Sequence, residues 1–162
     1  MNKHLKLVRE FHDAISLPQA EPGENRHLSD MDIVMRQALL MDEGSAVFKA
    51  IKAGEMVQIL LGLVNLAYCA LGALALCGGD VTERPVNWRH DGFVVSLMRT
   101  LSEQINRCAS GHADDYSALY CLCAHLSGRF INADFDKAFQ MVHDGKLSKP
   151  AKTPDLSDCL FE

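Results

Sequence analysis

MVQILLGLVNLAYCALGALALC, residues 56–77, has no charged side chain. Three structures fit such a stretch: a membrane span, the core helix of a helical bundle, or a helix whose functional acids have been replaced. It is long enough to cross a bilayer, but Gln58 and Asn65 would each need a polar partner in lipid. No aromatic belt flanks the stretch and its basic flanks show no strong asymmetry. We therefore expect a core helix and no membrane association.

The rest of the chain has helical periodicity, and no alternating strand pattern is evident. Segments on both sides of the uncharged stretch are amphipathic, so their apolar faces need a partner. Ser29 is a suitable N-cap for a helix that Gly54 would end. We predict one all-α domain over 1–162, a bundle of five or six helices. Its parts are a first helix over 1–15, a helix pair over 29–77, further helices over 92–142 and a mostly irregular tail over 143–162.

Composition excludes several classes of protein. The chain has 162 residues, enough for one compact domain, and 48% of them are hydrophobic. Its formal net charge of −5 argues against a nucleic-acid partner held by a basic face. The six cysteines form no CxxC motif and most lie in apolar runs, which is typical of reduced, buried thiols. With no signal-peptide pattern at the N-terminus, we expect a cytoplasmic protein.

Four segments, in order, carry a resemblance to a known family. They are VREFHDAISLP (8–18), ALLMDEGSAV (38–47), LGLVNLAYCALGA (61–73) and FDKAFQMVHDGKLSKPAKTPDL (135–156). Together they resemble the MazG-like all-α nucleoside triphosphate pyrophosphohydrolases. The resemblance implies an all-α fold, a homodimer, and a Mg²⁺ site whose carboxylates hold a nucleoside triphosphate for cleavage to the monophosphate and pyrophosphate.

The acids on which that chemistry depends are mostly replaced. The family's EExxE motif falls on Asp42, Glu43 and Ala46, and the two acid positions of the next helix fall on Leu61 and Asn65. The resemblance thus implies Asp42, Glu43 and Asn65 as remaining metal ligands, with Glu43 as the catalytic acid. Neighbouring residues on a helix diverge by about 100°, so Asp42 and Glu43 do not easily chelate one ion. Both could instead belong to a solvated helix face.

The closing segment supplies the candidate substrate-binding residues. His143, Lys146 and Lys149 could meet a phosphate, although basic residues near a chain end are commonly just solvated. The family's asparagine in this motif falls on Lys146, while its lysine is retained as Lys149.

We therefore expect a MazG-like protein whose hydrolysis is impaired or lost. One alternative is a working pyrophosphohydrolase with rearranged ligands, for example Glu55 or Asp80 together with Asp42 and Glu43. Another is a non-enzymatic regulatory or interaction protein that uses the fold as a dimeric scaffold.

Overall fold

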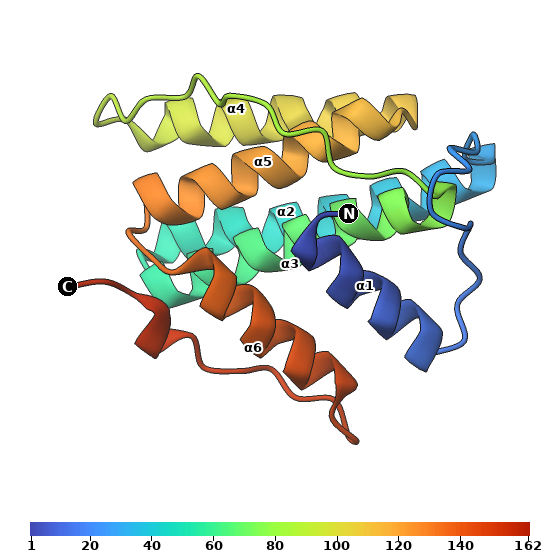
Figure 1. The fold of residues 1–162 in the computed structure, drawn as a ribbon. Coiled ribbons are helices and arrows are strands. Elements are labelled where there is room, and N and C mark those ends of the chain that lie inside the picture. The colour runs from blue at the N-terminus through green and yellow to red at the C-terminus, as the bar shows by residue number, and fades with distance from the viewer.

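The computed structural model describes residues 1–162 and is entirely helical, as predicted (Figure 1). Six α-helices and two short 3-10 helices follow one another along the chain. They are α1 (Lys3–Ala14), α2 (Asp30–Ala53), α3 (Met56–Cys77), α4 (Val94–Arg107), η1 (Cys108–Ser110), α5 (Ala113–Arg129), α6 (Phe135–Leu147) and η2 (Ser157–Cys159).

Helix α3 is the centre of the bundle. It packs between α2 and α5 and also contacts α1 and α6 (Figure 1). By length and composition α3 could cross a membrane, yet 78% of its most apolar 18-residue window is buried inside the fold. Burial of this kind is typical of a core helix, because the neighbouring helices cover its side chains as lipid otherwise would.

The ends of the central helix pair follow from local chemistry. The Ser29 hydroxyl accepts a hydrogen bond from the Asp32 backbone N–H at 3.1 Å, which caps the start of α2. Gly54 and Gly78 end α2 and α3 with φ angles of +71° and +74°, a conformation that side chains with a Cβ rarely adopt. The helix pair predicted over 29–77 is therefore present with those boundaries.

The prediction of an irregular tail from residue 143 is wrong in its starting point. Helix α6 continues to Leu147, and only 148–162 lie outside it, with η2 among them. The extra turn forms because His143 and Gly145 are buried against the rest of the fold. A Cβ at position 145 would lie 2.3 Å from the Lys152 carbonyl oxygen, since the tail turns back along α6 at this point.

Candidate functional site

A cavity of about 190 Å³ lies between α2, α3 and α6, and the segment after α6 also borders it. Glu43, Leu61, Asn65, Lys146 and Lys152 are among the residues that line it. Leu61 and Asn65 are four residues apart, so they share one face of α3, and both are partly buried. We call this cavity the α3 cleft.

The α3 cleft unites residues far apart in the sequence because three helices meet there. Helix α2 places Glu43 on one wall. Helix α6 brings Lys146 to the opposite wall. Of the site residues predicted from sequence, the structure brings together Glu43, Asn65 and Lys146.

Glu43 is half-buried, and its surroundings shift the pKa of its carboxyl in opposite directions. Burial raises the pKa of this carboxyl above its ordinary value, and the nearby Asp42 acts in the same direction. The Lys146 ammonium and a polar interaction with Asn65 both lower the pKa. Glu43 and Lys146 form no ion pair within 4.0 Å, although both line the cavity. The space between them is therefore open to a small ligand or to water.

Lys146 is held over aromatic rings and is not paired with a carboxylate. Its Nζ atom lies 4.9 Å from the centre of the Tyr68 ring and 5.8 Å from that of Phe11. Cation–π contacts of this length stabilise an ammonium without neutralising it. Lys146 therefore keeps its positive charge beside the cavity that it lines.

His143 does not belong to the α3 cleft. Its side chain is buried, its Nδ1 lies 2.9 Å from the Tyr68 hydroxyl, and its Nε2 lies 3.5 Å from a Glu10 carboxylate oxygen. The expectation that His143 meets a phosphate is corrected accordingly, because both ring nitrogens already face groups of the protein. His143 instead positions Tyr68, the ring on which Lys146 rests.

Two further predicted residues lie apart from the cavity. Asp42 is exposed and is not among the residues that line the cavity, as the 100° rotation between neighbouring helical positions requires. Lys149 is exposed in the segment after α6 and is likewise absent from the lining. Asp42 therefore does not join Glu43 and Asn65 in one ligand set.

The residues present do not fit a Mg²⁺ ion. Magnesium requires hard oxygen ligands in near-octahedral geometry, usually with carboxylates among them. The cavity offers one carboxylate, from Glu43, and one amide, from Asn65, while Leu61 is apolar and two lysines, Lys146 and Lys152, also line it. Nowhere in the structure do three or more His, Cys, Asp or Glu side chains gather as a metal site would need.

The structure adds residues that the sequence patterns did not reveal. Arg36 crosses α3 at Gly72, where a Cβ would lie 2.6 Å from its Nη1 atom. Cys69 lies four residues after Asn65 on the same face of α3. Burial, the largest effect, raises the pKa of Cys69 to about 11, so the thiol is neutral at neutral pH. The seven-residue spacing of Arg36 and Glu43 was the available signal for Arg36.

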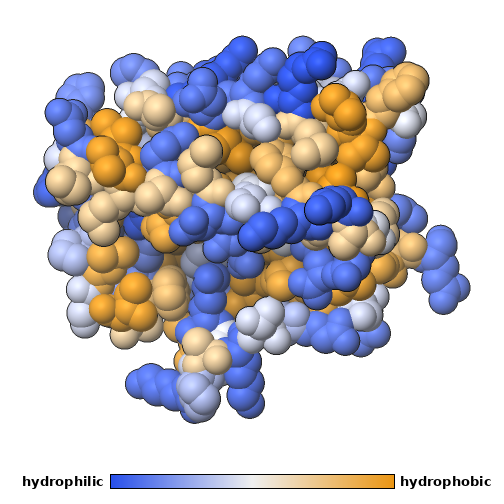
Figure 2. All heavy atoms as spheres, turned by 180° about the vertical axis from the view of Figure 1, so that it is seen from behind, coloured by the Kyte–Doolittle hydropathy of each residue, from blue (hydrophilic) through white to orange (hydrophobic).

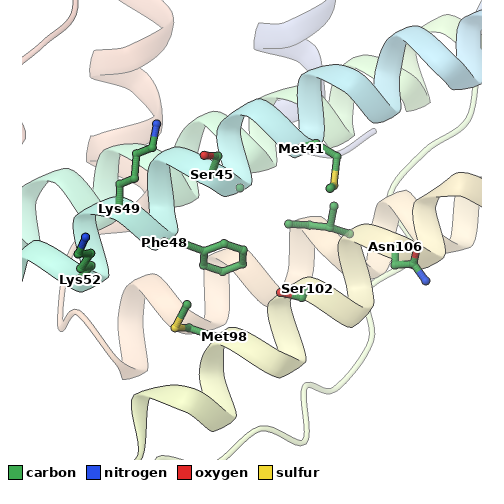
Figure 3. A pocket seen from close by; sticks show the side chains of 10 residues that line it. Met41, Ser45, Phe48, Lys49, Lys52, Met98, Ser102 and Asn106 are labelled. Atoms are coloured by element: carbon green, nitrogen blue, oxygen red, sulfur yellow. The ribbon is translucent and has the colours of Figure 1, made fainter.

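A second and larger groove lies on the other flank of α2, against α4. Its volume is about 620 Å³, and Phe48, Met41 and Met98 give it a mostly apolar lining (Figure 3). Phe48 extends from α2 into the space between the two helices, and Lys49 and Lys52 follow it along α2 (Figure 3). This groove contains no carboxylate and none of the site residues predicted from sequence.

Comparison of the chain with protein-family models, with curated proteins and with solved structures gave no match.

Proposed function

We propose that this protein is a MazG-like homologue that has lost Mg²⁺-dependent pyrophosphohydrolase activity. One observation carries the proposal: Glu43, Leu61 and Asn65, which the family resemblance assigns to acid positions on two separate helices, line the same cavity. A chance resemblance would not require these three positions to converge. Their identities, one acid among three, argue against hydrolysis.

The physical reason for the loss is electrostatic. In the reaction that the resemblance implies, metal ions offset the charge of the triphosphate and activate the attacking water. Leu61 offers no ligand atom and Asn65 offers no charge. The ammonium of Lys146, which lies near Glu43, repels a metal cation that enters the cavity. A divalent ion in this cavity would therefore meet the single carboxylate of Glu43, opposed by the lysines Lys146 and Lys152.

The experiment measures pyrophosphate release from a panel of nucleoside and deoxynucleoside triphosphates with Mg²⁺ or Mn²⁺. We expect rates no higher than those without protein; turnover of about 1 s⁻¹, a common value for enzymes, would refute the loss of activity.

A companion variant restores the acids through Ala46→Glu, Leu61→Asp and Asn65→Asp, together with Lys146→Asn. Calorimetry should detect Mn²⁺ binding to this variant and not to the wild type. Its matched control carries three new acids at exposed positions outside the cleft.

The alternative of rearranged metal ligands, with Glu55 or Asp80 joining Asp42 and Glu43, has little support from the cavity. Neither Glu55 nor Asp80 lines the cavity that contains Glu43. Asp80 is also engaged, because its carboxylate accepts a hydrogen bond from the Asn2 backbone at 3.0 Å.

A second candidate function, a dimeric interaction scaffold, has support from the exposed face of α2. Met31, Val34, Met35 and Met41 are 65, 60, 59 and 60% exposed and recur at helical spacing on one side of the helix. Figure 2, which shows the side hidden in Figure 1, has hydrophobic atoms at the surface in several groups. Soluble proteins usually cover such a face.

We propose that a second copy of this chain covers it. A twofold dimer places the same helix of both copies face to face. The residues of the exposed stripe, Val34, Met35 and Met41, carry no charge. Light scattering after size-exclusion chromatography should give twice the monomer mass. The variant Met35→Lys should shift the protein to monomer, whereas the control Lys52→Gln on the same helix should not. A monomeric wild type at micromolar concentration would contradict the dimer.

A further inference from the structure

The groove between α2 and α4 has the lining of a small-molecule site. Its hydrophobic residues are Phe48, Met41, Met98 and Ile105, and no aspartate or glutamate lines it (Figure 3). Its volume of about 620 Å³ falls within the range of about 300–1,000 Å³ that is typical of ligand pockets. We call this feature the α2–α4 groove.

The floor of the α2–α4 groove lies where the two helices touch. Gly44 and Ile105 line the groove and are buried, and a Cβ at position 44 would lie 2.9 Å from the Ile105 Cδ1 atom. The axes of helices in such contact lie about 8–10 Å apart, whereas an α-helix with its side chains is about 10–12 Å wide. A third helix therefore cannot enter between α2 and α4, but a single alkyl chain is narrow enough to do so.

Two lysines give the groove a positively charged end. Lys49 and Lys52 lie on α2 near Met98, and neither forms an ion pair within 4.0 Å (Figure 3). Both are exposed, and their flexible side chains can turn toward a ligand. The opposite end of the groove carries Asn106, which is uncharged (Figure 3). A ligand that matches this lining has a long apolar part and an anionic group at one end.

The length of the groove sets the size of such a ligand. Met41 and Lys52, near its two ends, lie eleven positions apart on α2, which corresponds to about 16 Å along the helix. With C–C bonds of about 1.5 Å, an extended chain of roughly twelve carbons covers this length. Met41 and Met98 can adapt to the chain, because methionine side chains are flexible.

We propose that the α2–α4 groove binds a free, long-chain aliphatic monocarboxylate of the fatty-acid class. The alkyl chain lies along Phe48 and Met98, and the carboxylate meets Lys49 and Lys52. None of the residues that line this groove also lines the α3 cleft, so the proposal does not rest on the proposed loss of hydrolysis.

The ligand leaves most of the proposed dimer face free. Of the exposed stripe on α2, only Met41 lines the groove, while Met31, Val34 and Met35 do not. Binding of the carboxylate and formation of the dimer can therefore be measured separately.

The test titrates the full chain with dodecanoate, below the concentration at which it forms micelles, in an isothermal titration calorimeter. We expect saturable binding of one dodecanoate per chain. Decanoate and octanoate should bind more weakly, by about fourfold for each CH₂ removed, because every CH₂ lost removes buried apolar surface. Dodecyltrimethylammonium, which has the same chain length and a positive head group, should bind weaker than dodecanoate by about tenfold or more, since two lysines repel it.

A double variant tests the charged end of the groove. Lys49→Gln combined with Lys52→Gln should bind dodecanoate about tenfold more weakly, within the range of two exposed charge pairs. Arg99→Gln is the matched control, because Arg99 is an exposed cation on α4 that does not line the groove. This control should bind like the wild type.

Ser102→Trp tests the apolar part. Ser102 is exposed and lines the groove, so an indole at this position occupies the space of the alkyl chain and should abolish binding. Ala46→Trp is the control, since Ala46 is exposed on α2 and does not line the groove. Circular dichroism checks that each variant is folded, and Ser45→Trp, at another exposed position of the lining, replaces Ser102→Trp if the latter fails to fold.

Absence of dodecanoate binding by the wild type, or equal affinity for dodecanoate and dodecyltrimethylammonium, would overturn the proposal. If the wild type binds no dodecanoate and Ser102→Trp converts a dimer to a monomer, the groove is instead an interface between two copies of the chain. Neither result bears on pyrophosphate release with Mg²⁺, so this proposal and the proposed function fail separately.

Discussion

Gly62→Ala tests the contact between α2 and α3 on which the α3 cleft depends. Gly62 is buried in α3 and faces Val47, which is fully buried in α2. A Cβ at position 62 would lie 2.6 Å from the Val47 Cγ2 atom and 3.3 Å from its Cα atom. The side-chain atom can move by rotation, but the backbone atom can move only if α2 and α3 separate.

Two opposing contributions set the magnitude. Overpacking of a well-packed core costs about 1–3 kcal/mol, while replacing a mid-helix glycine with alanine gains up to about 1 kcal/mol in helix propensity. The balance is a loss of about 1 kcal/mol in the free energy of unfolding. For a chain of this size, that loss lowers the melting temperature by about 2–4 °C. Urea unfolding followed by circular dichroism measures the first value and calorimetry the second.

Gly128→Ala is the matched control, since Gly128 lies in α5 and a Cβ there would have no atom within 4 Å. This variant should be as stable as the wild type or slightly more stable. Combining Gly62→Ala with Val47→Ala should give a smaller loss than the sum of the single losses, because the second change removes the clashing methyl. If Gly62→Ala were as stable as Gly128→Ala, the close approach of α2 and α3 described above would be wrong.

Three further variants probe other contacts. Tyr68→Phe removes the hydroxyl that lies 2.9 Å from His143 Nδ1 and leaves that buried nitrogen unpaired, so urea titration should show a loss of about 1–2 kcal/mol. Because the pKa of His12 falls from 6.5 to about 4 on folding, the unfolded chain binds more protons between these values, and stability falls as pH drops through this window. His12→Asn should remove about 3 kcal/mol of that decrease, read as the difference between the two stability–pH curves; parallel curves would exclude the assignment. Asp134→Ala removes the side-chain acceptor for the Lys137 N–H at 3.0 Å and should cost about 1 kcal/mol of stability, whereas an unchanged unfolding midpoint would show that the cap is not formed.

Features that are local or repeated along the chain could be predicted from the sequence. The boundaries of α2 and α3 depend on Ser29, Gly54 and Gly78, each of which acts on its own backbone neighbourhood. Helix α3 is apolar on all sides, so in a water-soluble bundle its surface is buried only if other helices surround it. Its central place follows from this composition. The end of α6 could not be predicted in the same way. His143 is a polar residue, which in sequence suggests an exposed tail, but in the fold it is paired with Tyr68 and the helix continues past it.

For the site, the sequence by itself determined that positions 46, 61 and 65 carry no acid, since a residue type at a given position needs no coordinates. It also determined that Asp42 and Glu43 point in different directions, because the helical rotation per residue is fixed. Only the tertiary structure decided that Glu43 and Lys146 line the same cavity beside Asn65. Glu43 and Lys146 lie 103 positions apart, and no local preference of either helix links them. Their meeting depends on how α2 and α6 pack on α3, which is settled by side-chain shape, including the close approach that Gly62 allows.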